Sequence, residues 1–352
     1  MPLIEYAMIV GAIAALVHAY RWFRARGDAS NLVVWISSVV CVLLLEPFAY
    51  APQWFGLETQ PGPLIVHNRF SVQFLHDRLP LYIVAMYPVF VYVAYVIVQH
   101  TGAFRRHGPV VGATCVMFVF HCLYAVIDTV AVQFRWWVWS ETLSLSKPAL
   151  GAVPYVNIQA FALGVPFALA LATSVVTRRT RPGSAIMVGC AVGVVCLLIW
   201  PIELALAAPA VIIDLVGAST ETGRFVGTWL LVTIAGAVTA SVFARIDRHP
   251  DVDVTDAREG RDRFALTCVM VYLLIAAGIW IAALPDYLTA RDGHTLDGAP
   301  LGSLPYAVIT FVLSIALTTR AYRRTTRRSS QVTGRPAVPG ASTMQSRDTA
   351  AG

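Results

Sequence analysis

This sequence has little charge. Only 13% of its 352 residues are Asp, Glu, Lys or Arg, whereas 57% are hydrophobic, and the mean hydropathy is +0.66. A composition so far from that of soluble domains excludes an ordinary soluble fold. Apolar runs of about 20 residues recur, each long enough to cross a bilayer core of roughly 30 Å. We therefore predict an all-α, polytopic helical bundle that crosses the cell membrane many times.

The sequence also lacks the motifs of several enzyme classes. It has no HxxxH and HxxHH set, no DDxxD or NDxxD, no DxDD, and no GxSxG, HExxH or P-loop. These absences argue against a di-iron desaturase, a magnesium-dependent prenyltransferase or terpene synthase, and a nucleotide-dependent enzyme. We expect any catalysis to need no cofactor and no metal.

Cysteine is present but forms no ligand pattern. None of the six cysteines belongs to a CxxC or a Cys/His spacing, and all lie inside apolar runs. We interpret them as small apolar packing residues. They are Cys41, Cys115, Cys122, Cys190, Cys196 and Cys268.

The apolar runs predict nine membrane helices. A disordered basic cytoplasmic tail is expected to follow the bundle, which gives a transmembrane unit at 1–325 and a tail at 326–352. We place the helices at about 3–23, 31–50, 80–98, 110–132, 154–176, 185–207, 225–244, 264–284 and 305–322.

The basic residues predict the direction of the helices. Twenty of the 26 lie in the connections after the first, third, fifth and seventh helices and in the tail. Cytoplasmic loops carry the excess of Lys and Arg, so the N-terminus is expected outside and the C-terminus inside. The net charge of +6 is then a topology signal, and we expect no nucleic-acid partner.

Acidic residues gather toward the predicted outer ends of the helices. Ionisable groups inside membrane spans are costly and mark functional sites by default. Glu46 and Asp128 are flanked by apolar residues on both sides, although a structural hydrogen-bonding role stays open for each. Glu46 and Tyr50 are four residues apart and so share one helix face. The acids in or near spans are Glu5, Glu46, Asp128, Glu203 and Asp214.

The segment 121–139, HCLYAVIDTVAVQFRWWVW, places Asp128 shortly before three tryptophans. Tryptophans at a span end are equally typical of the interfacial belt. Burial disfavours the charged form of a carboxyl group, so a buried acid can act as a proton donor near neutral pH. Aromatic faces stabilise cations, and a closed pocket protects reactive intermediates from water. The pattern fits protonation of an apolar alkene or epoxide.

The order of features from Glu46 to Asn157 resembles two related families. A Glu ends an early helix, the proline-started RLPLYIVAMYPVFVYVAY follows, an Asp ends the next helix, and VPYVNIQAF follows a Trp-rich loop. This order is similar to that in CruF-type carotenoid hydratases. It also resembles integral-membrane terpene cyclases of fungal meroterpenoid and actinobacterial sesquiterpenoid pathways. The resemblance covers residues 46–165 and implies protonation of a long isoprenoid chain.

Three hypotheses follow. The first is a metal-independent isoprenoid cyclase acting on a lipophilic chain from the bilayer, with Glu46 or Asp128 as proton donor and the other acid as polarising group or final base. The second is a carotenoid or isoprenoid hydratase that uses the same acids, and the third is a non-enzymatic membrane transporter. The candidate catalytic residues are Glu46, Asp128, Asn157, His67 and Glu203. The candidate substrate-binding residues are Tyr50, Tyr82, Tyr87, Tyr124, Trp136, Trp137, Trp139, Tyr155 and Trp200.

Overall fold

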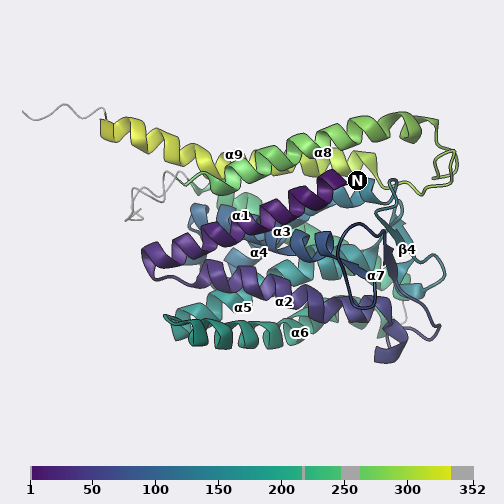
Figure 1. The fold of residues 1–352 in the computed structure, drawn as a ribbon, viewed down its shortest axis with the longest axis horizontal. Coiled ribbons are helices and arrows are strands. Elements are labelled where there is room, and N and C mark those ends of the chain that lie inside the picture. Colours follow the sequence, from purple (N-terminus) through teal and green to yellow (C-terminus); the bar gives the residue numbers. More distant parts are fainter. Residues whose placement is uncertain (1, 216–218, 247–261, 334–352) are drawn as a thin grey trace, which may run out of the picture.

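The protein is an all-α bundle, as the composition predicted (Figure 1). The computed structural model describes residues 2–215, 219–246 and 262–333. Nine helices in these ranges are long and apolar enough to cross a membrane. They are α1 (Pro2–Arg26), α2 (Ser30–Tyr50), α3 (Leu81–Thr101), α4 (Ala103–Ala131), the segment Asn157–Thr180 that ends in α5 (Val165–Thr180), α6 (Ala185–Leu215), α7 (Thr220–Ala244), α8 (Phe264–Thr289) and α9 (Leu304–Thr333).

The last helix ends later than the sequence indicated. α9 continues to Thr333, through 326–333, where the tail was expected to begin. The rest of the expected tail, 334–352, lies outside the described residues.

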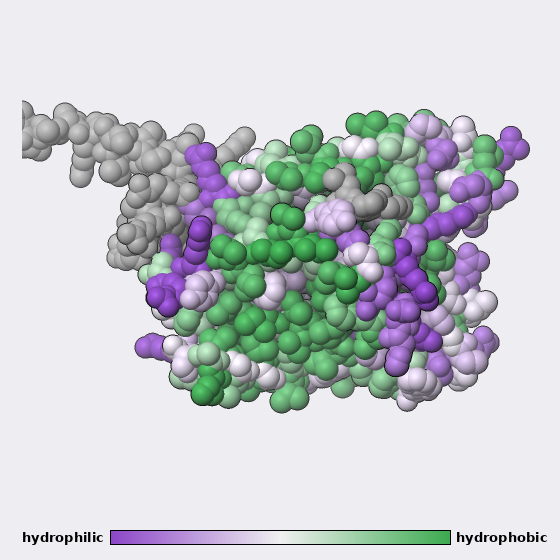
Figure 2. Space-filling model, viewed as in Figure 1, coloured by the Kyte–Doolittle hydropathy of each residue, from purple (hydrophilic) through white to green (hydrophobic). Residues whose placement is uncertain are grey.

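A hydrophobic band crosses the middle of the molecule, with hydrophilic residues gathered at both ends (Figure 2). Three helical segments form the centre of the bundle. In the apolar windows of α3, α4 and 157–180, the buried shares are 89%, 83% and 78%, against 28–44% in the other six spans. The peripheral helices therefore present their outer faces to lipid, while α3, α4 and α5 form the core.

Short strands, unforeseen in the sequence, cover one end of the bundle beside the last turns of α2 and α4. The longest pair joins β1 to β4, two segments about 70 residues apart. The elements at this end are η1 (Pro52–Phe55), β1 (Ile65–His67), β2 (Gln73–Phe74), β3 (Leu79–Pro80), β4 (Trp137–Trp139), η2 (Ser144–Ser146), β5 (Pro148–Leu150) and β6 (Val153–Pro154), with β2 paired to β3 and β5 to β6.

Two helices depart from regular α geometry. Inside α4, Gly108 has φ +85° and precedes Pro109, so the apolar part of the helix starts at the kink, close to the predicted residue 110. The predicted helix at 154–176 instead begins as strand β6 and continues as the π-helix η3 (Asn157–Gly164) before α5. π-Helical turns are rare and frequently occur at functional sites.

Candidate active site

A two-stranded lid closes the end of the bundle. Side chains alternate between the two faces of a strand, so β1 and β4 each direct every second residue inward. His67 pairs with Trp137, and Ile65 pairs with Trp139. All four side chains line one pocket, whereas Val66 and Val138 are exposed on the opposite face.

The three tryptophans after Asp128 are not a lipid-facing belt. Trp136, Trp137 and Trp139 are 4%, 2% and 6% exposed, so they are buried within the protein. Belt tryptophans sit at the membrane surface, where lipid headgroups reach them. The lid explains the burial, because pairing of β4 with β1 folds this segment back over the helices.

Glu46 comes from the last turn of α2 and lines the pocket directly. Its side chain is only 4% exposed, and its Oε2 atom has no hydrogen-bond partner among the described residues. An unpartnered buried carboxylate oxygen is costly, and such exceptions call for a functional explanation. Glu46 therefore has an oxygen atom available for chemistry inside the pocket.

Asp128 comes from the last turn of α4 and is tied to the pocket wall. Its Oδ2 accepts a hydrogen bond of 2.6 Å from the Asn157 side-chain amide, at the start of η3. Its Oδ1 is buried with no partner in the described part of the chain. Tyr87 and Tyr124 lie near enough to interact electrostatically with both Asp128 and Glu46. The predicted pair of acids thus shares one site.

His67 connects the lid to α2. Its Nδ1 atom lies 3.0 Å from the Tyr50 hydroxyl, and the rings meet edge to face. Burial lowers the pKa of His67 to about 3, so the imidazole is neutral near pH 7. His67 is therefore a neutral hydrogen-bonding partner of the Tyr50 hydroxyl.

The pocket is small. Its volume is about 20 Å³. A cavity of about 10–15 Å³ by this measure holds one water molecule. A larger group therefore enters only if the lid or the surrounding side chains move. The pocket is lined by Glu46, Ile65, His67, Ile83, Met86, Tyr87, Tyr124, Trp137, Trp139, Asn157 and Phe161.

Glu203 lies apart from this pocket, against Gly164 at the end of η3. A Cβ atom placed on Gly164 would come within 2.2 Å of the Glu203 Oε2 atom. Only glycine allows the carboxyl group to approach the backbone this closely. The Glu203 Oε1 atom is buried without a hydrogen-bond partner in the described ranges.

Besides Tyr50, which is hydrogen-bonded to His67, four of the predicted substrate-binding residues do not line the pocket. Tyr82 donates a 3.0 Å hydrogen bond to the Trp136 carbonyl and so supports the lid from below. Trp136 itself stacks on Phe134. Trp200 packs on Phe48 and is 37% exposed. The fourth is Tyr155, whose ring meets Phe225 edge to face.

Sequence reasoning missed the apolar half of the pocket wall, formed by Ile65, Ile83, Met86 and Phe161. Such residues are indistinguishable from ordinary core residues until their neighbours are known. It also missed His121, buried in α4 and hydrogen-bonded to Tyr306 of α9. The spacing of His121 and Asp128, two helical turns apart on one helix, was the available signal.

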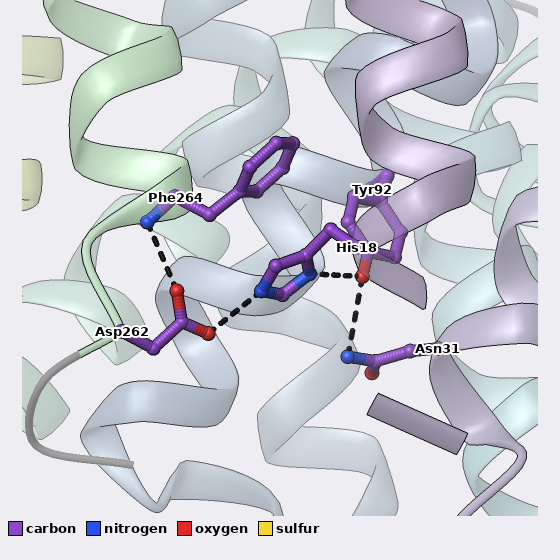
Figure 3. Close-up of polar contacts among 5 residues, drawn as sticks. All are labelled: His18, Asn31, Tyr92, Asp262 and Phe264. Carbon is purple, nitrogen blue, oxygen red and sulfur yellow. Dashed lines mark hydrogen bonds and ion pairs between the residues drawn. The ribbon is translucent and has the colours of Figure 1, made fainter. Parts of the chain in front are cut away.

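A second polar cluster lies at the other end of the bundle (Figure 3). His18 bridges Asp262, at 2.8 Å, and the Tyr92 hydroxyl, at 2.6 Å. Asn31 donates to the same hydroxyl, and the Phe264 backbone N–H donates to Asp262. Burial opposes ionisation of Asp262, but the hydrogen bond and charge of His18 outweigh it and hold the pKa below its usual value. The cluster fastens α8 to α1 and α3.

No three His, Cys, Asp or Glu side chains within the described ranges are grouped so that they could hold a metal ion. All six cysteines are free thiols.

Comparisons of the chain with protein-family models, with curated proteins and with solved structures found no match.

Proposed function

We propose that this protein is an integral-membrane isoprenoid cyclase that starts its reaction by protonation. The observation that supports the proposal most directly is the convergence of Glu46 and the Asp128–Asn157 pair on one buried pocket beneath an aromatic lid. A protonated carboxyl group in an apolar, water-poor site is a general acid suited to an alkene or epoxide.

Glu46 is the proposed proton donor because its side chain lines the pocket. Its proton adds to the terminal alkene carbon, or to the epoxide oxygen, and leaves a tertiary carbocation on the adjacent carbon. The next double bond of the chain supplies two electrons and closes a ring. A base, Glu46 or Asp128, finally removes one proton, so an alkene substrate and its product have equal mass.

Aromatic side chains supply the stabilisation that a carbocation needs. Trp137 and Trp139 from the lid, with Tyr87 and Tyr124 from the core helices, present ring faces and edges around the pocket. Cations are attracted to the negative face of an aromatic ring, most strongly to tryptophan. Asn157 holds Asp128 in position through its 2.6 Å hydrogen bond.

Hydration is the second candidate function, and the size of the pocket favours it. A cavity of about 20 Å³ accommodates one water molecule. In a hydratase this water captures the same carbocation before a double bond reaches it. The acid and the aromatic lid then have the same roles in both reactions.

The test is expression of the full chain in a bacterial host that supplies linear isoprenoids and their terminal epoxides, followed by mass analysis of extracted products. A product of unchanged mass and altered retention supports cyclisation. A gain of one water supports hydration. No product in membranes that contain folded protein would overturn both enzymatic proposals and favour the transporter hypothesis.

A further inference from the structure

The short helix η1, which follows α2 at the lid end of the bundle, leaves large apolar side chains uncovered. Trp54 is 80% exposed, more than any other Phe, Tyr or Trp side chain in the described ranges. Phe55 and Leu57 are 44% and 47% exposed. Single exposed apolar residues are common, but a group of them that includes a tryptophan marks an interaction surface. We call Trp54, Phe55 and Leu57 the η1 patch.

The η1 patch continues the lipid-facing surface of two helices. Phe55 stacks on Phe48 of α2, with the ring centroids 3.9 Å apart, and Phe48 meets Trp200 of α6 at 4.7 Å. Both helices are peripheral, since their apolar windows are only 44% and 33% buried. A row of aromatic rings therefore leads from the membrane-spanning surface of the bundle to η1.

The backbone of η1 suits a place with little water. The Trp54 N–H donates to the Ala51 carbonyl, and the Leu57 N–H donates to the Pro52 carbonyl, both at 3.0 Å. Pro52 has no N–H to satisfy. Gly56, with φ +70°, allows the chain to close this turn. Backbone groups without a partner are costly away from water, and these turns supply partners from within the segment.

The one charged residue of this segment is bonded to the protein. From Phe48 to Val66, Glu58 is the single residue among Asp, Glu, Lys and Arg. Its Oε1 atom accepts hydrogen bonds from the Ser144 hydroxyl, at 2.9 Å, and from the Leu145 backbone N–H, at 2.6 Å. The segment is therefore two-sided, with its acid tied to the neighbouring connection and its apolar side chains exposed.

A lipid surface fits the η1 patch better than a second copy of the chain does. Trp is enriched where membrane meets water, because its ring is apolar and its indole N–H still reaches polar groups. The tryptophans of the lid are buried, whereas Trp54 and Trp200 are exposed beside the lipid-facing helices. The unbroken row of rings favours one continuous contact with lipid.

We propose that the η1 patch inserts into the boundary between headgroups and acyl chains of the leaflet on the lid side, with phospholipid as its partner. The membrane surface then lies at the level of Phe48 and Trp200. Glu46 precedes Phe48 by two residues, which is about 3 Å along a helix. The lidded pocket is therefore within reach of chains in that leaflet, and the contact with lipid holds whatever reaction the pocket performs.

The experiment measures tryptophan fluorescence of the full chain in phosphatidylcholine nanodiscs. The lipid is unlabelled, brominated near the glycerol or brominated near the methyl ends of the chains, and iodide is the quencher in water. The difference between the unaltered protein and Trp54→Phe isolates the emission of Trp54. We expect this emission to lose about half of its intensity or more with bromine near the glycerol, because interfacial tryptophans lie at the headgroup level. Iodide should quench it little.

Phe55→Ser combined with Leu57→Ser should reduce the quenching of Trp54 by brominated lipid, because both side chains hold η1 in the leaflet. The matched control Val66→Ser, on the exposed face of the lid, should leave it unchanged, and Trp139→Phe should remove no lipid-quenched emission. Size-exclusion profiles and circular dichroism establish that each variant is folded. Quenching of Trp54 by iodide but not by bromine, or protection from both as under a second copy of the chain, would overturn the proposal.

Discussion

At the scale of single residues, the site depends on two buried carboxyl groups with different surroundings. Glu46 faces the pocket, with Oε2 unpartnered among the described residues, whereas Asp128 is held by the Asn157 amide. A carboxyl group that lines a cavity can reach a ligand directly. A carboxyl group that is hydrogen-bonded behind the cavity wall can position and polarise the side chains of that wall. This difference leads us to assign the proton transfer to Glu46.

The first prediction concerns these two acids. Glu46→Gln should lower turnover at least about 100-fold, because general acid catalysis typically contributes 10²–10⁴-fold and an amide cannot supply the proton. Asp128→Asn should lower it as well, since it disturbs the Asn157 contact. Product formation per folded protein is the measurement. Glu141→Gln, in an exposed part of the lid region, is the matched control and should keep full activity.

The second prediction follows from the lowered pKa of His67, about 3 in the folded protein against an ordinary value near 6.5. Between these values the unfolded chain binds a proton that the folded chain excludes. Stability is then greatest above about pH 6.5 and falls as the pH is lowered toward 3. Melting temperatures across this range should decline less steeply in His67→Gln than in the unaltered protein. Identical slopes in the two proteins would contradict this role.

At the scale of elements, the π-helix η3 determines what the wall of the site contains. Its first residue, Asn157, reaches Asp128 of α4, and its last residue, Gly164, receives the Glu203 carboxyl group from α6. The short π-helix η3 thus contacts both Asp128 and Glu203. A regular α-helix would place its side chains at a different angle, because a π-turn changes the number of residues per turn.

The third prediction tests the contact between η3 and α6. Gly164→Ala should destabilise the protein by about 1–3 kcal/mol, the usual cost of overpacking, because the new methyl group would meet the Glu203 Oε2 atom. The added substitution Glu203→Ala should recover part of the loss. Gly189→Ala, in α6 with nothing within 4 Å of the new methyl group, is the control. Thermal or denaturant unfolding in detergent gives the comparison, and additive effects of the two changes would rule out the contact.

At the scale of the whole molecule, the bundle has two unlike ends. Strands and aromatic residues cover one end. The His18 cluster and a pocket lined by Arg26, Arg105 and Arg178, the arginine pocket, lie at the other. Three largely buried helical segments connect them through the hydrophobic band. The two ends therefore present different chemistry, aromatic rings at the lid and ionisable side chains at the opposite end.

The fourth prediction concerns the direction of the bundle. Lys147 is the one lysine in the sequence, and it is exposed in the connection between α4 and α5. Positive-inside bias places this connection outside the cell. A membrane-impermeant amine reagent should label Lys147 on intact cells, and peptide mapping of Lys147→Arg should show that signal lost. Labelling only after lysis would reverse the orientation.

Much of the fold was predictable because membrane insertion is governed by local properties. Nine apolar segments were long enough to span a bilayer, and nine such helices are found among the described residues, most beginning and ending within a few residues of the expected positions. The larger differences are local too, such as α6, which extends to Leu215, beyond the expected 207. Pro209 favours an end to the helix near the expected position, but α6 continues through it.

The sequence by itself determined the number of spans, their apolar faces and the short list of buried acids, because length, hydropathy and charge act residue by residue. Only the tertiary structure decided which of these segments and side chains lie in contact. The pairing of His67 with Trp137 joins segments 70 residues apart, and the arginine pocket joins the ends of five helices. Such contacts depend on how helices pack and how loops close, and no local pattern in the chain encodes them.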